Sequence, residues 1–209
     1  MSEIIPLPVT ALIVPVLAYF FKILTPAAAM APFSNTIIFL FMGGFTLAAL
    51  LNRYNIDLWL ADRVIRLAGG NLWLSIIGFY GVTSILSMFI SNTATTAMMV
   101  PIAVSLIDKQ FPRMRTMLLL GTAYAANIGG NGTVVGSPPN AIAAAALELT
   151  FFDWFKVGFP TLIFMFPLVI ISLWFVIKPE KDAYVNKIDN TAFEWSARSK
   201  GAVCLFLFT

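Results

Sequence analysis

The chain has 209 residues, of which 59% are hydrophobic and only 11% are charged, and its formal net charge is +3. A soluble domain carries about 25% charged residues, so this composition leaves too little polar surface to face water on all sides. It excludes a soluble globular protein. The modest net charge also gives no reason to expect a nucleic-acid partner.

Four long stretches contain no Asp, Glu, Lys or Arg. They are residues 23–52, 67–107, 116–147 and 157–177. A helix that crosses a hydrocarbon core of roughly 30 Å needs about 20 apolar residues, and each stretch is long enough. Transmembrane β-strands would instead show short segments of alternating polarity. The sequence therefore predicts an all-α polytopic membrane protein, with the lipid bilayer as its surroundings.

Residues 1–67 are predicted to form scaffold-type spans and an interfacial helix. The two spans are expected at about 7–21 and 34–51. In residues 52–67 charges return with helical spacing, and one face of that helix is apolar: Ile56, Leu60, Val64 and Leu67. The charged residues that lie away from this face are Arg53, Asp57, Asp62 and Arg66. This pattern predicts a helix in the interface plane, with a solvated loop helix as the alternative.

The uncharged stretch 67–107 is too long for one span and is interrupted by the polar run Ser87–Thr96. It forms either two full spans joined by a tight turn or one re-entrant hairpin. Both interpretations place the Arg- and Lys-rich flanks in the cytoplasm, as the positive-inside rule requires. The polar turn favours the hairpin, because irregular backbone at membrane depth survives only inside protein or beside a water-filled cavity.

The stretch 116–147 is predicted to be a discontinuous span. A helical segment reaches Ala126, a Gly- and Pro-rich break follows, and an Ala-rich segment covers residues 141–147. Four Gly and two Pro do not fit one continuous helix. Ser137 as N-cap and Pro138 at the first helical position would start the second half-helix.

The predicted organisation has four segments. Residues 1–67 form scaffold spans, and 68–150 form a transport-domain segment with the hairpin and the unwound helix. Residues 151–200 hold a full span, at about 157–177, and a cytoplasmic loop, and 201–209 begin a truncated span. The first residues lack a positively charged segment, so we do not expect a signal peptide.

The two polar breaks contain the residues that are expected to bind ligands. The hydroxyls of Ser84, Ser87 and Ser91 are spaced to line one face of the first hairpin arm. Where a helix restarts, its first N–H groups lack intrahelical partners and attract anions. Freed carbonyl groups in 129–136 suit a small cation. Together the breaks predict a carboxylate and a Na⁺ ion bound near the bilayer midplane.

The absence of ionisable residues from the predicted membrane spans limits which ion can be coupled to transport. The uncharged stretches contain no Asp or Glu, and the whole chain has no His. Proton relays usually need such groups, so sodium coupling is favoured. The alternative is that Ser84, Gly129 and Gly130 serve only helix packing.

The motifs at both breaks resemble those of a known family. Ser91-Asn92-Thr93 is followed by Ala-Thr-Thr-Ala-Met-Met-Val-Pro101, and Gly129-Gly130-Asn131-Gly132-Thr133 precedes Gly136-Ser137-Pro138-Pro139-Asn140. This pair is similar to the signature of the divalent anion/sodium symporters, which carry succinate, citrate and related anions. The resemblance covers nearly all of the chain.

The resemblance implies roles for named residues. It implies a sodium site at Ser87, Ser91, Asn92 and Gly136, and carboxylate contacts from Asn92, Thr93, Ser137 and Pro138. It also implies one repeat of an inverted-repeat, elevator-type transporter that works as a homodimer in the plasma membrane (the bacterial inner membrane). Family members are roughly twice as long and carry a second Ser-Asn-Thr hairpin, so we expect a missing second half.

The function expected from these features is sodium-coupled symport of di- or tricarboxylates such as succinate or citrate. An anion exchanger of the same fold is one alternative, and a non-transporting membrane subunit or inactive fragment is another. An enzyme is not expected, because the chain has no His, no membrane-embedded carboxylate and no cofactor motif.

Overall fold

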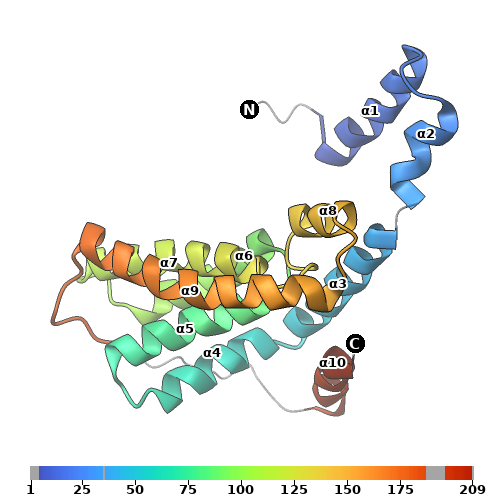
Figure 1. The fold of residues 1–209 in the computed structure, drawn as a ribbon. Coiled ribbons are helices and arrows are strands. Elements are labelled where there is room, and N and C mark those ends of the chain that lie inside the picture. The colour runs from blue at the N-terminus through green and yellow to red at the C-terminus, as the bar shows by residue number, and fades with distance from the viewer. Residues whose placement is uncertain (1–4, 35, 187–195, 209) are drawn as a thin grey trace. The chain divides into compact units, whose positions relative to one another are not determined.

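The computed structural model describes residues 5–34, 36–186 and 196–208, and they form helices joined by turns and loops (Figure 1). An isolated β-bridge joins Ile107 to Val185, and no strand forms within these ranges. The all-α prediction is confirmed for this part of the chain. The chain divides into two compact units, residues 1–42 and 43–209, and the predicted four-segment organisation stays a prediction.

The first unit contains α1 (Leu7–Phe20), α2 (Pro26–Met30) and η1 (Ala31–Ser34). It ends within α3 (Thr36–Arg53). The Thr25 side chain caps α2 by accepting a 3.3 Å hydrogen bond from the Ala28 N–H. Helix α1 coincides with the first predicted span, and most of its apolar side chains are exposed.

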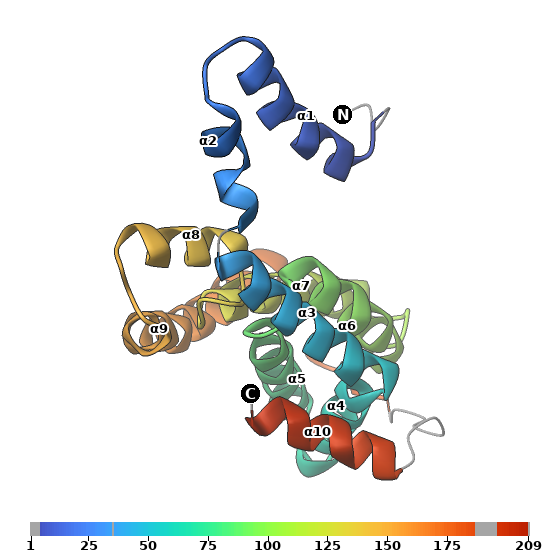
Figure 2. The same cartoon turned by 90° about the vertical axis from the view of Figure 1, so that its right-hand side faces the viewer.

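The second unit is built around α7 (Pro112–Gly130). This helix packs against α5 (Leu72–Ser87), α6 (Asn92–Leu106) and α9 (Phe151–Ile177), as Figures 1 and 2 show. The core between the helices includes the buried side chains of Phe79, Tyr80, Met99 and Leu118.

Glycines in α7 allow α5 to approach closely. A Cβ at Gly121 would lie 2.1 Å from the Tyr80 hydroxyl oxygen, and one at Gly129 would lie 2.3 Å from the Ser84 carbonyl oxygen. The Tyr80 hydroxyl donates a 2.8 Å hydrogen bond to the Met117 carbonyl across the same contact. Only glycine fits at Gly129, since the neighbouring atoms belong to the backbone of α5.

Helix α4 (Ile56–Leu67) packs against α5, and the residues it buries are not those of the predicted apolar face alone. Ile56 is buried, whereas Leu67 is 73% exposed and Asp62 is only 8% exposed. Asp62 tolerates this position because its carboxylate accepts a 2.7 Å hydrogen bond from Arg66 Nε one turn later. The expectation that Asp62 lies on the exposed, charged face is wrong, whereas the interfacial position of the helix, with Leu67 on its apolar face, stays a prediction.

Within the described residues, α9 is the one helix both long and apolar enough to cross a membrane, and Pro8–Phe20 and α5 are apolar but shorter. A capping box starts α9, in which Thr150 and Asp153 satisfy each other's backbone N–H groups. Two further helices complete the unit: α8 (Pro138–Ala146) and α10 (Ala197–Phe208). Helix α10 contains most of the segment predicted to begin a span, but starts earlier, and its Ala202 packs against Ile56.

Candidate functional site

The first break lies between Ser87, the last residue of α5, and Asn92, the first of α6. The name hairpin is used below for α5, this turn and α6, whether or not they cross the bilayer. Ser91 is the N-cap of α6, and its side chain accepts a 3.3 Å hydrogen bond from the Ala94 N–H. The expectation that Ser91 continues the serine face of the first arm is wrong, because α5 ends at Ser87. Ser84 donates a 2.9 Å hydrogen bond to the Ala125 carbonyl of α7, so its hydroxyl serves helix packing.

The second break lies between α7 and α8. Helix α7 continues to Gly130, beyond the predicted end at Ala126, and α8 begins at Pro138. Ser137 occupies the N-cap position and Pro138 the first turn, as predicted. The Ser137 side chain makes no capping hydrogen bond, however, which leaves its hydroxyl available for another partner.

The two breaks meet at Asn92. Its Oδ1 accepts a 2.8 Å hydrogen bond from Ser87 Oγ, and its Nδ2 donates a 3.3 Å hydrogen bond to Asn127 Oδ1 of α7. A Cβ at Gly130 would lie 2.1 Å from Asn92 Oδ1, so the amide packs directly on that glycine. These four residues, Ser87, Asn92, Asn127 and Gly130, are called the Asn92 cluster below.

Gly136 is held next to this cluster. A Cβ there would lie 2.4 Å from the Gly130 carbonyl oxygen. Asn140 fixes the arrangement, because its Nδ2 donates to the carbonyls of Gly130 at 2.8 Å and Thr133 at 2.9 Å. The structure thus brings the predicted residues Ser87, Asn92 and Gly136 into one chain of contacts through Gly130.

Thr133 ties the two breaks together. Its hydroxyl donates to the Met88 carbonyl in the hairpin turn and accepts a 3.1 Å hydrogen bond from the Gly136 N–H. Sequence reasoning gave no role to Thr133, Asn127 or Asn140. The sequence shows these amide and hydroxyl side chains within an uncharged stretch, which indicates that they are buried. It does not show which partner each of them contacts.

The carbonyl groups of the second break are less free than predicted. The Gly129 carbonyl accepts from the Gly132 N–H at 2.9 Å, and the Asn131 carbonyl accepts from Trp154 Nε1 at 3.1 Å. Asn140 occupies the carbonyls of Gly130 and Thr133. The Gly136 carbonyl, in contrast, accepts no hydrogen bond from the part of the chain that the structure describes.

Three hydroxyls near the hairpin tip and the start of α8 lack protein partners among the described residues. Thr93 is exposed and Ser137 is partly buried, and the hydroxyl of neither makes a hydrogen bond to another described residue. Thr95 is fully buried, and its Oγ1 has no hydrogen-bond partner.

The polar groups of the site carry no formal charge. No cluster of three or more acidic, His or Cys side chains occurs among the described residues. Its polar groups are amides, hydroxyls, carbonyls and the N-terminal ends of α6 and α8. The two glycines have different neighbours: Gly129 packs on the α5 backbone, whereas Gly130 faces the Asn92 side chain.

Comparison with known proteins assigns the family. The family model described as "Citrate transporter" matches residues 1–208. An uncharacterized transporter of Haemophilus influenzae is 43% identical over 185 residues, which are 86% of this chain and 40% of that protein. An uncharacterized transporter of Methanocaldococcus jannaschii is 42% identical over 187 residues, 88% of this chain and 43% of that protein.

A relative with a named activity is also similar. The sodium-dependent dicarboxylate transporter SdcS of Staphylococcus aureus is 34% identical over 193 residues, 84% of this chain and 37% of that protein. The chain thus spans about two fifths of the length of these relatives. The chain belongs to the citrate transporter family of membrane proteins, and the resemblance to the divalent anion/sodium symporters is confirmed.

Proposed function

We propose that this chain supplies half of the substrate site of a sodium-coupled symporter for di- or tricarboxylates such as succinate or citrate. The observation that carries the proposal is the Asn92 cluster, in which the hairpin tip and the broken α7–α8 segment share one set of neutral polar groups. The name of SdcS, a sodium-dependent dicarboxylate transporter, supports both the ion and the substrate class.

The cation would be held by neutral oxygens. Of the residues proposed for sodium, Ser87 and Asn92 lie 2.8 Å apart at their side-chain oxygens, and the Gly136 carbonyl accepts no other hydrogen bond from the described chain. Ser91 contributes a hydroxyl at the cap of α6. Hydroxyl, amide and carbonyl oxygens are suitable ligands for a hard monovalent cation.

The carboxylate would be held by two helix starts. Asn92 and Thr93 form the first turn of α6, and Ser137 and Pro138 begin α8. The N–H groups of Asn92 and Thr93 carry partial positive charge, and the hydroxyls of Thr93 and Ser137 add donors. Pro138 and Pro139 have no N–H, so α8 contributes the Ser137 hydroxyl. Asn92 packs on Gly130, whose carbonyl bonds to Asn140 of α8, which links both helix starts through one residue.

The helix lengths favour a re-entrant hairpin over two full spans. Helices α5 and α6 have 16 and 15 residues, so each rises about 23 Å, less than the roughly 30 Å of a hydrocarbon core. We further propose an inverted-repeat, elevator-type homodimer in the plasma membrane. In it a second half, which lies outside this chain, completes the site.

Uptake into proteoliposomes that contain the full-length transporter tests the proposal. Radiolabelled succinate should accumulate under an inward sodium gradient and not under an equal potassium gradient. Accumulation that requires a preloaded internal anion, and not sodium, would identify an exchanger instead. No uptake and no thermal stabilisation by sodium with succinate would identify a non-transporting subunit and refute the proposal.

A further inference from the structure

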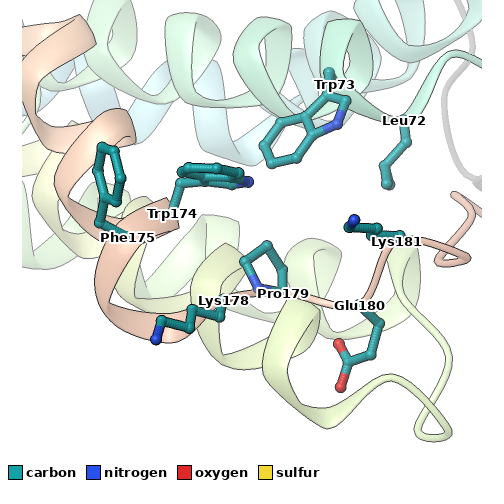
Figure 3. A pocket seen from close by; sticks show the side chains of 8 residues that line it. All are labelled: Leu72, Trp73, Trp174, Phe175, Lys178, Pro179, Glu180 and Lys181. Atoms are coloured by element: carbon teal, nitrogen blue, oxygen red, sulfur yellow. The ribbon is translucent and has the colours of Figure 1, made fainter.

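A cavity of about 530 Å³ lies at the junction of α5, α9 and the loop that follows α9. Its apolar walls come from Leu72, Trp73, Trp174, Phe175 and Pro179, and Lys181 is its basic residue at the centre. Figure 3 shows Trp73, Trp174 and Lys181 pointing toward the same space, while Lys178 and the Glu180 carboxylate point away. The Asn92 cluster contributes no residue to this cavity.

The cavity carries an uncompensated positive charge. Lys181 has no carboxylate within ion-pair distance among the described residues. The neighbouring Glu180 is occupied elsewhere, since its two carboxylate oxygens accept hydrogen bonds from the N–H groups of Arg113 at 3.1 Å and Met114 at 2.8 Å. An anion in the cavity would therefore meet a free ammonium group.

The two indole rings add unused hydrogen-bond donors. Neither Trp73 nor Trp174 makes a side-chain hydrogen bond within the described chain, whereas the Trp154 indole N–H donates to the Asn131 carbonyl. An indole N–H acts only as a donor, so both rings suit an acceptor-rich anionic group such as a phosphate. Their apolar faces suit hydrocarbon.

With α9 crossing the bilayer, the cavity would lie at the level of a membrane–water interface. From Trp154 to Trp174 helix α9 rises about 30 Å, which is close to the thickness of a hydrocarbon core. Tryptophan is enriched at both interfaces, and Lys directs its ammonium toward headgroups from the same depth. Lys178 follows α9 immediately, so Trp174 and Lys181 lie where glycerol and phosphate groups are found.

We propose that this cavity binds an anionic phospholipid. Its phosphate group lies against Lys181 and the indole N–H groups, and its acyl chains run along the exposed apolar side of α9, where Phe175 and Val176 are 62% and 81% exposed. The unpaired charge selects an anionic over a zwitterionic headgroup. This site is independent of the proposed transport activity, because it requires only that α9 crosses the bilayer.

Tryptophan quenching by brominated lipids tests the site. The full-length protein is placed in phosphatidylcholine bilayers that contain a minor fraction of dibrominated phosphatidylglycerol or dibrominated phosphatidylcholine. The quenching of Trp73 and Trp174 is the part of the signal that a Trp73→Phe/Trp174→Phe variant loses. We expect this part to report a preference of about fivefold for the anionic lipid, the size of one lysine contact with an anionic surface.

Lys181→Gln should remove this anionic preference without changing the quenching by brominated phosphatidylcholine. Lys109→Gln is the matched control, since Lys109 is also an exposed loop lysine but does not line the cavity, and it should keep the preference. Millimolar inorganic phosphate should not compete, and competition would identify a free-anion site instead. Equal quenching by both lipids, an unaffected Lys181→Gln variant, or no quenching of the two indoles would overturn the proposal.

Discussion

The Asn92 side chain is fixed by contacts on three sides. Ser87 Oγ donates to its Oδ1, its Nδ2 donates to Asn127, and Gly130 lies directly beneath the amide. A polar group that is already oriented loses little conformational entropy when a ligand binds. The geometry of this one amide is therefore the most sensitive point of the candidate site.

Replacing Gly130 by Ala should displace the Asn92 amide without unfolding the protein. The new Cβ would lie 2.1 Å from Asn92 Oδ1, and the end of a side chain can move where backbone cannot. Loss of the oriented amide should weaken sodium-dependent stabilisation by at least about tenfold in sodium concentration, the effect of one hydrogen bond to a charged ligand. Thermal unfolding of the full-length protein at increasing sodium concentration measures this.

Gly81→Ala is the matched control for that experiment. Gly81 lies in α5, and a Cβ there would meet nothing within 4 Å. The substitution should leave the sodium response unchanged and should stabilise α5 by about 0.5–1 kcal/mol, because glycine is unfavourable inside a helix. An equal loss of sodium response in both variants would contradict the role given to Gly130.

Asn140→Ala should destabilise the broken segment. It removes the donor shared by the buried carbonyls of Gly130 and Thr133, and an unsatisfied buried acceptor costs about 1–3 kcal/mol. The thermal unfolding midpoint of the purified protein should fall clearly. Asn131→Ala, at an exposed position in the same segment, should leave it nearly unchanged, and a similar loss in both variants would argue against this anchor.

At the scale of elements, α7 is anchored at its N-terminus by a residue from the loop after α9. Glu180 accepts hydrogen bonds from the N–H groups of Arg113 and Met114, in the first turn of α7. Burial alone would raise the pKa of Glu180, but hydrogen bonds from backbone N–H groups and the charge of Arg113 outweigh it and lower the pKa. A carboxylate at a helix N-terminus is stabilising, so Glu180 links the α9 loop to α7.

This contact gives stability a defined pH dependence. Because the folded state lowers the pKa of Glu180 from its ordinary value of 4.5, the stabilisation is fully present above that value. It is lost as the pH falls through the lowered folded value. Glu180→Ala should cost about 1 kcal/mol at neutral pH, as for a lost helix cap, and should make the unfolding midpoint less sensitive to acid.

Asp182→Ala provides the comparison, since Asp182 is an exposed acid in the same loop with no described hydrogen bond. It should change neither the midpoint at neutral pH nor its acid dependence. If Glu180→Ala behaves like Asp182→Ala, Glu180 does not anchor α7.

The sequence predicts the elements better than their packing. The hairpin break near Ser91 and the restart at Pro138 follow from local chemistry, because caps and proline act within one turn. The extension of α7 to Gly130 could not be predicted, since it depends on Gly129 packing against the α5 backbone. The buried position of Asp62 likewise depends on packing against α5 together with its pairing with Arg66.

At the scale of the whole molecule, the sequence predicts only part of the site, because the rest depends on contacts between segments far apart in the chain. Ser87, Asn92 and Gly136 stand out as polar or flexible residues in uncharged stretches, and the structure links them. The residues that hold them, Asn127, Thr133 and Asn140, make contacts between segments far apart in the chain or within the irregular break. No local pattern shows which buried amide meets which carbonyl.

The chain covers only part of the length of its relatives, and this decides which protein a transport measurement needs. It spans about two fifths of their length, and every group of the Asn92 cluster is neutral. In the proposed account a carboxylate held here needs the bound cation and the groups of the second half to complete its coordination. Transport is therefore to be measured on a full-length transporter, whereas the contacts of the Asn92 cluster form within this chain.

Sodium-dependent succinate uptake by the full-length transporter carrying Asn92→Ala tests the central claim most directly. Asn92 is the one residue proposed to contact both the cation and the carboxylate. We expect uptake to fall to the level seen without sodium, while the protein still elutes as a folded species from size-exclusion chromatography. Uptake equal to the unmodified protein, with the same sodium dependence, would contradict the assignment of the site.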